Sequence, residues 1–206
     1  MKKINWNIMI FTCLLCLMPI CLGIYFYEEL PESMAIHFNI NNEPDNWASK
    51  NFTLFALPII MAGLQIFCCI VSDIAESKTG NSPKISKIMK WFVPIVTILI
   101  YTLTILIGLG KTVDIGKIIC IFLGLMFIVM GNYMPKIPYE DAKLNMKPVP
   151  KSEKEYRKML RIMAYSFIVG GIAIIGAIFA SGKAAFITIL GLCFIVFVES
   201  IYFAFK

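Results

Sequence analysis

The sequence predicts an all-α membrane protein with six transmembrane helices. Apolar residues make up 59% of its 206 residues and charged residues only 16%, whereas soluble domains contain about 45–50% and about 25% of these classes. The apolar residues form six runs of about 20 residues, the length at which an α-helix crosses a hydrocarbon core about 30 Å thick. These runs are residues 8–27, 52–72, 91–110, 115–134, 162–180 and 184–205. We therefore expect a single integral membrane domain over residues 1–206.

The positions of lysine and arginine predict the orientation of these helices. With both termini on the cytoplasmic side, the inner segments hold 15 of the 19 Lys and Arg residues. The outer segments hold the other four, so the distribution follows the positive-inside rule. The inner segments are residues 1–7, 73–90, 135–161 and Lys206, and the outer segments are residues 28–51, 111–117 and 181–183. The basic balance is explained by topology and by contact with the anionic lipid bilayer, and we expect no direct nucleic-acid binding.

The first apolar run, residues 8–27, is expected to remain as a membrane helix. It is too long for the apolar region of a secretory signal peptide, and no small-x-small cleavage site follows it. All seven cysteines of the chain lie within the six runs. We therefore expect no disulfide framework outside the membrane.

Residues 28–51 form a short outer loop between the first two helices, and their pattern predicts that this loop is folded. Within it, residues 36–40 alternate between apolar and polar side chains, which favours a short extended segment. In such a segment His37 and Asn39 face outward. The apolar residues, expected to pack on the helix ends or the lipid interface, are Ile36, Phe38 and Ile40.

The second half of this loop leads into the next helix. Residues 41–46 are rich in Asn, with Pro44 and Asp45, and these residue types favour turns. Trp47 follows where an aromatic belt at the membrane interface places such a side chain. Lys50 is expected close to the lipid headgroups, where the second helix begins.

The other connections differ in length and polarity. The outer segments 111–114 and 181–183 predict tight turns, and residues 73–90 predict a short polar link on the inner side. Residues 135–161 form the main cytoplasmic loop. Near its end, Ser152 and Glu155 have capping-box spacing, and the residues after them predict a basic amphipathic lead-in on the inner membrane surface.

Three prolines fall inside the first three predicted helices. A proline in a helix lacks the N–H that would bond the carbonyl four residues earlier, so it loosens or kinks the helix. The prolines are Pro19, Pro58 and Pro94.

His37 is the sole histidine of the chain and the first candidate functional residue. Together with Glu43 and Asp45 it offers one nitrogen and two carboxylates, which is a small ligand set, so we expect no metal site. Histidine can also act as a pH-responsive donor. The interpretation that we favour is a hydrogen-bond network with Asn39 and Asp45 that holds the loop.

Glu199 is the one acidic residue inside a predicted helix, and intramembrane carboxylates are costly and mark candidate functional sites. It lies seven residues before Lys206, so it is about 10 Å from the inner end of its helix. From there it can reach the interface, pair with Arg161 or another inner basic residue, or serve as the proton site of a small transporter. No catalytic motif occurs in the chain, so we expect neither an enzyme nor a cofactor.

Two segments resemble a known family. Residues 30–50 read LP-(x)5-HFN-(x)4-PD-x-W-x-SK, which is similar to the outer-loop motif of the DUF1648 domain. Residues 131–136, GNYMPK, close the fourth helix and resemble the GN-x-M-P motif of SdpI-like proteins. The matching positions are His37, Asn39, Pro44, Asp45, Trp47 and Lys50 in the outer motif, and Gly131, Asn132, Met134 and Pro135 in the inner one.

This resemblance implies a six-helix protein of the bacterial cell membrane that gives immunity to a secreted peptide toxin or bacteriocin. It also implies a receptor that captures a cytoplasmic transcriptional repressor when the toxin is present. Family members usually carry a G-I-R-T-x-W segment in the cytoplasmic loop, whereas residues 137–147 here read IPYEDAKLNMK. We therefore expect the immunity to be less affected than the signalling. The alternatives are a proton-coupled transporter that uses Glu199 and an accessory subunit that docks a partner through residues 152–163.

Overall fold

Six helical spans account for most of the described chain. The computed structural model describes residues 4–39, 41–79, 84–140, 143 and 150–205. Within these residues, six helices are long and apolar enough to cross a membrane, which confirms the multi-pass prediction. The spans are Trp6–Tyr25, Phe52–Glu76, Ser86–Gly108, Ile115–Lys136, Glu153–Ala177 and Gly182–Phe203.

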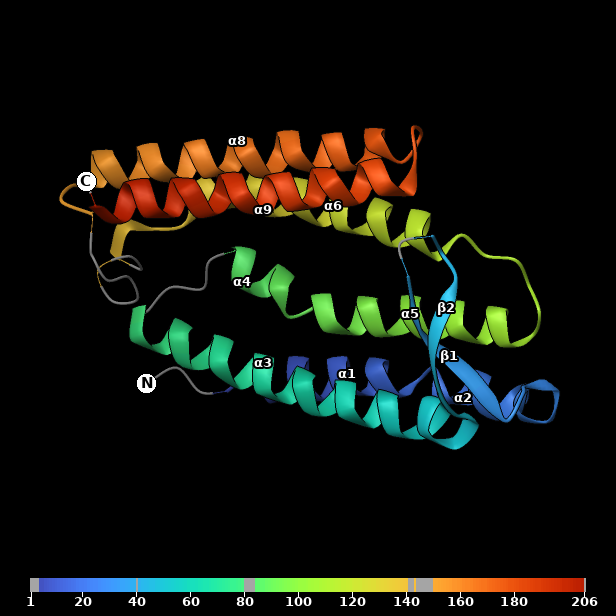
Figure 1. Cartoon of the computed structure of the whole chain (residues 1–206). Coiled ribbons are helices and arrows are strands. Elements are labelled where there is room, and N and C mark those ends of the chain that lie inside the picture. Colours follow the sequence, from blue (N-terminus) through green and yellow to red (C-terminus); the bar gives the residue numbers. More distant parts are fainter. Residues whose placement is uncertain (1–3, 40, 80–83, 141–142, 144–149, 206) are drawn as a thin grey trace. The chain divides into compact units, whose positions relative to one another are not determined.

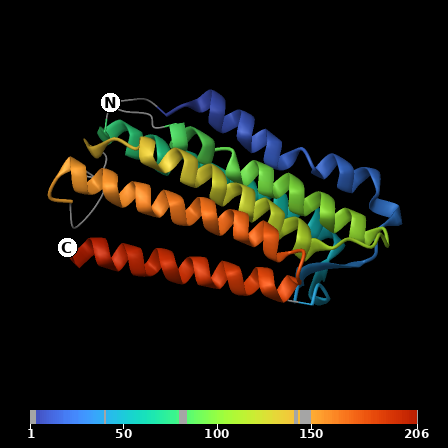
Figure 2. The ribbon, with the colours of Figure 1, turned by 90° about the horizontal axis from the view of Figure 1, so that it is seen from above.

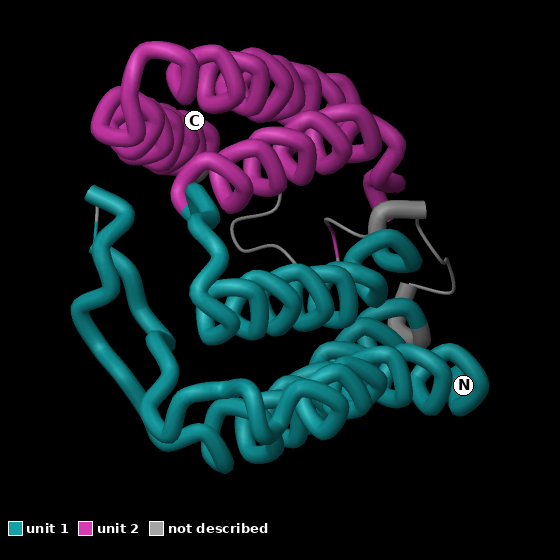
Figure 3. Tube along the Cα trace, turned by 90° about the vertical axis from the view of Figure 1, so that its right-hand side faces the viewer, with its two compact units in different colours: residues 1–82, 86–115 teal, residues 83–85, 116–206 magenta. Residues whose placement is uncertain are grey.

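The chain divides into two compact units (Figure 3). Unit 1 comprises residues 1–82 and 86–115, and unit 2 comprises residues 83–85 and 116–206. The first three spans therefore belong to unit 1 and the last three lie in unit 2. The single domain over residues 1–206 stays a prediction, because compact units of one chain can belong to one domain or to two.

Each span of unit 1 is interrupted beside a proline. Its helices are α1 (Trp6–Leu17), α2 (Ile20–Tyr25), the short η1 (Tyr27–Glu29), the π-helical η2 (Phe52–Ala56), α3 (Leu57–Thr79), α4 (Lys84–Met89) and α5 (Phe92–Gly108). Pro19 separates α1 from α2, Pro58 follows η2, and Pro94 follows the break between α4 and α5. The irregularities predicted at these prolines are therefore present (Figure 1).

Tyr101 supplies the hydrogen bond that Pro58 cannot make. Because proline has no N–H, the carbonyl of Leu54, four residues earlier, loses its usual helical donor. The Tyr101 hydroxyl on α5 donates to that carbonyl at 3.2 Å, and both residues are buried. Gly23 of α2 leaves room for this contact, because a Cβ at that position would collide with the hydroxyl. One contact thus brings together all three spans of unit 1.

Gln65 has the same role at Pro94. The missing N–H of Pro94 leaves the Lys90 carbonyl without its helical donor, and Nε2 of Gln65 on α3 donates to it at 2.8 Å. The same nitrogen lies 2.8 Å from Oγ1 of Thr12 on α1, and the Gln65 and Thr12 side chains are fully buried. An unpaired backbone carbonyl is costly within a bilayer, so these side chains compensate for the prolines.

A β-hairpin lies at the end of unit 1 opposite the N-terminus (Figure 1). Its strands are β1 (Ser33–Phe38) and β2 (Pro44–Ser49), which pair antiparallel. The predicted extended segment is therefore present, and it belongs to a two-stranded sheet. The buried cluster beneath it comprises Leu30, Met34, Leu54, Tyr101 and Ile105.

The helices of unit 2 pack closely through small residues. They are α6 (Ile115–Tyr133), the short η3 (Met134–Lys136), α8 (Glu153–Ala177) and α9 (Gly182–Phe205), and α8 and α9 lie side by side (Figure 2). A Cβ built on Gly124 of α6 would lie 2.7 Å from the Gly171 carbonyl oxygen of α8. This separation fits only when neither helix has a side chain there, as at the small-residue contacts of membrane helices.

The predicted amphipathic lead-in forms the first turns of α8 and is continuous with the fifth span. The Ser152 hydroxyl accepts the Glu155 N–H at 3.2 Å, which confirms the predicted N-cap. The apolar residues of these turns are buried on one face. They are Tyr156, Met159 and Leu160, and they cluster with Met134 and Ala164.

Candidate functional site

The register of the hairpin determines which side chains face away from unit 1. Met34 pairs with Ala48 and is 1% exposed, so this pair faces the core of the unit. The next pair, Ala35 with Trp47, must face the other way, because side chains alternate along a strand. His37 follows on the same outward face. The prediction that His37 faces outward is in keeping with this geometry.

His37 and Asp45 form a cross-strand pair. Nδ1 of His37 lies 2.5 Å from Oδ1 of Asp45, and both side chains are exposed. The register is irregular only around His37, which lies opposite Asn46, and it returns to its earlier alignment at Phe38 and Pro44. The pair therefore spans the irregular step of the ladder and joins the two strands there.

Asn39 organises the turn that follows. Its Oδ1 accepts the N–H groups of Asn41 at 2.9 Å and Glu43 at 3.1 Å, and its Nδ2 donates to the Glu43 carboxylate at 3.1 Å. Asn42 has φ of 65°, a left-handed conformation that asparagine tolerates. The expected hydrogen-bond network therefore has two parts, the His37–Asp45 pair and the turn around Asn39.

Lys50, expected beside the lipid headgroups, is instead buried in the base of the hairpin. It is 6% exposed, and its Nζ donates to the carbonyls of Tyr27 at 3.2 Å and Leu30 at 3.0 Å. The same nitrogen lies 2.9 Å from Oε1 of Glu32 and 4.5 Å from the centre of the Tyr27 ring. The prediction was wrong because Lys50 pairs with Glu32 on the inward face of the ladder. Lys50 thus anchors the hairpin.

The exposed apolar residues of the hairpin are Trp47 and Ile36. Trp47 is 51% exposed and Ile36 is 39% exposed. Ile36 does not pack on the helix ends, because the ladder becomes irregular at this point and Ile36 has no Cα partner in β2. Its other predicted location, the lipid interface, stays a prediction. Phe38 is half-buried, and Ile40 lies outside the described residues.

The GN-x-M-P residues lie at the end of α6 and in η3, and two of them serve in packing. Gly131 faces α8, where a Cβ would come 2.6 Å from the Ala164 carbonyl oxygen, and Met134 is buried in the cluster around Tyr156. Pro135 lies in η3, and Asn132 is exposed. Two of the four residues are therefore held by helix packing, with no need of a ligand.

The Gly131→Ala variant is expected to destabilise the protein. The added Cβ meets a backbone carbonyl oxygen that cannot move without separating α6 from α8, and overpacking of this kind costs about 1–3 kcal/mol. Thermal unfolding of the detergent-purified protein measures the effect.

Gly176 provides a matched control for this variant. A Cβ built there meets nothing within 4 Å, so Gly176→Ala is expected to be neutral or to stabilise α8 by about 0.5–1 kcal/mol. Equal melting temperatures for the Gly131→Ala and Gly176→Ala proteins would contradict the assignment of Gly131 to the helix contact.

Glu199 on α9 bonds to Ser166 on α8. The Ser166 hydroxyl donates to Oε1 of Glu199 at 2.5 Å, and Oε2 is buried with no partner among the described residues. Arg161 was one of the partners that the sequence allowed, and the bond to Ser166 takes its place. The contact joins two neighbouring helices of unit 2.

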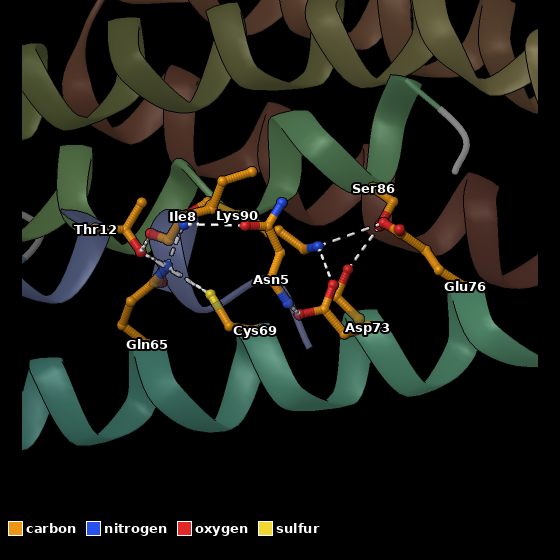
Figure 4. Close-up of polar contacts among 10 residues, drawn as sticks. Asn5, Ile8, Thr12, Gln65, Cys69, Asp73, Glu76, Ser86 and Lys90 are labelled. Atoms are coloured by element: carbon orange, nitrogen blue, oxygen red, sulfur yellow. Dashed lines mark hydrogen bonds and ion pairs between the residues drawn. The ribbon is translucent and has the colours of Figure 1, made fainter. Parts of the chain in front are cut away.

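Unit 1 also contains a buried polar cluster at its other end, which the sequence did not predict (Figure 4). Nζ of Lys90 lies 2.5 Å from Oδ1 of Asp73 and 3.4 Å from Oε1 of Glu76. The backbone N–H of Asn5 donates to Oδ2 of Asp73 at 3.0 Å, and the Ser86 hydroxyl donates to Glu76 at 2.6 Å. Lys90, Asp73 and Glu76 are 4%, 7% and 7% exposed.

The prediction of a polar link over residues 73–90 was therefore wrong for these three side chains. α3 continues to Thr79, so Asp73 and Glu76 belong to its last turns and face the other spans. The sequence offers one signal: Lys90 lies four residues before Pro94, where the kink turns the Lys90 carbonyl toward Gln65. Within the described residues, no group of three or more His, Cys, Asp or Glu side chains could hold a metal ion.

Residues 14–62 match the family model of a domain of unknown function, DUF1648. The match covers the second half of the first span, the whole hairpin and the start of α3. The chain thus carries a DUF1648 domain whose centre is the hairpin. The searches against curated proteins and against solved structures gave no match.

Proposed function

We propose that this protein is an SdpI-like immunity protein of the bacterial plasma membrane, and that its hairpin recognises a secreted peptide toxin. The observation that carries the proposal is the outward face of the hairpin. There His37, Asp45 and Trp47 are exposed side by side on a base fixed by buried Met34 and Lys50. Exposed aromatic and charged side chains on a rigid support are typical of recognition surfaces.

The chemistry of the hairpin suits a cationic or amphipathic peptide. Residues 28–50 contain five acidic residues, whereas their one lysine, Lys50, is buried and paired with Glu32. A cationic toxin is attracted to such a surface before it enters the lipid. Capture at the hairpin would then keep the toxin from forming lesions.

The capture of a cytoplasmic transcriptional repressor is the less supported half of this proposal. The segment that distinguishes family members, G-I-R-T-x-W, is replaced here within residues 137–147, most of which lie outside the described residues. The basic first turns of α8 offer a charged surface for such a partner. Immunity is therefore the function that we place first.

The proposal predicts that His37→Ala and Asp45→Ala abolish protection. Each variant removes one member of the cross-strand pair, and an exposed pair contributes only about 0–1 kcal/mol to stability, so the protein still folds and inserts. A toxin-sensitive bacterium that produces each variant is challenged with the secreted toxin that the family's namesake neutralises. We expect survival to fall to that of cells without the protein.

Lys111→Ala is the matched control, because Lys111 is exposed on the connection after α5 and lies outside the hairpin. It is expected to protect fully, and the amount of each variant in the membrane is measured by immunoblot. Full protection by both hairpin variants at normal abundance would remove the hairpin from the mechanism.

A further inference from the structure

The outer edge of β2 carries backbone groups that the hairpin does not use. The N–H of Lys50 donates to the carbonyl of Glu32 at 2.8 Å, so these residues form a hydrogen-bonded pair. Hydrogen-bonded and non-bonded pairs alternate along an antiparallel ladder. Ser33 with Ser49 and Ala35 with Trp47 are therefore the non-bonded pairs. The N–H and C=O groups of Trp47 and the N–H of Ser49 consequently point away from β1, whereas the Ser49 carbonyl faces the helix that begins at Lys50 and serves as its first acceptor.

Among the described residues, no third strand pairs with this edge. Five of the six residues of β2 are exposed and the sixth, Ala48, is half-buried, whereas β1 contains the buried Met34. An open strand edge is a template for pairing with another chain, and proteins usually blunt it with lysine or a covering loop. In β2 the only lysine nearby, Lys50, points inward, and the edge is left open.

Charge determines which chain suits this edge. Residues 28–50 have a formal charge of −4, from Glu28, Glu29, Glu32, Glu43 and Asp45 against Lys50. Two copies of the protein that paired edge to edge would bring these carboxylates together, and like charges across a sheet are destabilising. A basic segment has the opposite charge and gains from the same field.

We propose that the outer edge of β2 takes an extended, cationic peptide segment as a third strand of the sheet. The inference rests on the proposed function, because it names how the hairpin would recognise its peptide. Main-chain hydrogen bonds to Trp47 and Ser49 provide affinity, as in other cases of strand addition. The indole of Trp47 and the carboxylate of Asp45 then contact alternate side chains of the segment, one apolar and one basic. The six residues of β2 accommodate a segment of about the same length.

Backbone-modified peptides test this proposal on the full chain. The protein is placed in phosphatidylcholine nanodiscs and mixed with a synthetic peptide of the repeat Lys-Thr-Val-Thr, in which lysine and valine alternate along one face of the strand. The matched peptide is identical but N-methylated at every second residue, so it cannot donate along one edge. A third peptide has glutamate in place of lysine. Binding is followed by the fluorescence of Trp47 in a Trp6→Phe, Trp91→Phe background, and amide hydrogen exchange is measured at Trp47 and Ser49.

We expect the lysine peptide to bind and to slow exchange at Trp47 and Ser49 by about tenfold or more, while the amide of Ala48, already paired with Met34, changes little. The N-methylated peptide should bind roughly tenfold more weakly, since it loses main-chain hydrogen bonds. The glutamate peptide should not bind.

Three outcomes would overturn the inference. These are no binding of the lysine peptide, equal binding of the methylated and unmethylated peptides, and protection of Trp47 without peptide that grows with protein concentration. The last would assign the edge to a second copy of the chain. If any of these outcomes occurs while His37→Ala and Asp45→Ala still abolish protection, strand addition is wrong but the proposed function stands. If those variants protect fully, the proposed function fails whatever the edge binds.

Discussion

Replacing Lys90 with methionine is expected to lower the free energy of unfolding by about 3–5 kcal/mol, the usual cost of removing one partner from a buried ion pair. Methionine retains most of the volume of the side chain, so the loss is electrostatic. The ammonium lies 2.5 Å from the Asp73 carboxylate and 3.4 Å from that of Glu76. Both carboxylates are 7% exposed at the end of an apolar helix, where an uncompensated charge cannot be solvated.

Lys87 supplies the control for this experiment. It lies in α4, one turn before Lys90, and its side chain is exposed, so Lys87→Met is expected to change stability by no more than about 0.5 kcal/mol. The triple variant Lys90→Met, Asp73→Asn, Glu76→Gln removes all three charges and should recover part of the loss. Melting temperatures in detergent compare the proteins. If the Lys90→Met and Lys87→Met proteins have the same melting temperature, the cluster does not stabilise unit 1.

The sequence predicts the number of helices because hydropathy is a local property. A run of about 20 apolar residues predicts a membrane-spanning helix by its length and hydropathy alone, whatever the helix packs against. The extended segment around His37 was likewise visible in a period of two residues. The prolines marked the irregular place in each of the three spans of unit 1. Each of these predictions depends on neighbours within a few residues of chain.

The predictions that failed depend on partners far away in the chain. Lys50 was expected close to the lipid headgroups and Lys90 in the polar link over residues 73–90, because a lysine at the end of an apolar run usually lies at the interface. Lys50 is instead folded over Tyr27, 23 residues earlier, and Lys90 reaches Asp73, 17 residues earlier. Nothing in the local sequence distinguishes a lysine that snorkels from one that finds buried acceptors.

In the folded protein, buried polar side chains donate to the carbonyls that the prolines leave without a helical donor. Pro58 and Pro94 each free one carbonyl, and Tyr101 and Gln65 each supply one buried donor from another span. A polar side chain within a membrane helix needs a partner, and so does the carbonyl that a proline exposes. Pairing the two satisfies both carbonyls, the Tyr101 hydroxyl and the Nε2 group of Gln65, and it fixes the packing of the three spans beneath the hairpin.

Replacing Lys50 with methionine is expected to detach the hairpin from the helices and to abolish protection. The carbonyls of Tyr27 and Leu30 would lose their common donor, and hydrogen bonds to a charged group contribute about 1.5–3 kcal/mol each. The pair with Glu32 adds little, because the Glu32 side chain is 91% exposed. The local cost of losing both bonds is therefore about 3–6 kcal/mol, more than a two-stranded hairpin provides on its own.

Hydrogen exchange distinguishes this result from general unfolding. In Lys50→Met, the inward amides of Met34 and Ala48 should exchange at least about tenfold faster, while those of α3 and α5 keep their protection. Lys111→Met, on an exposed lysine at the same end of unit 1, should change neither hairpin exchange nor survival. A Lys50→Met protein with a protected hairpin and full immunity would show that the anchor is dispensable. A protected hairpin without immunity would instead place the Lys50 ammonium itself in toxin recognition.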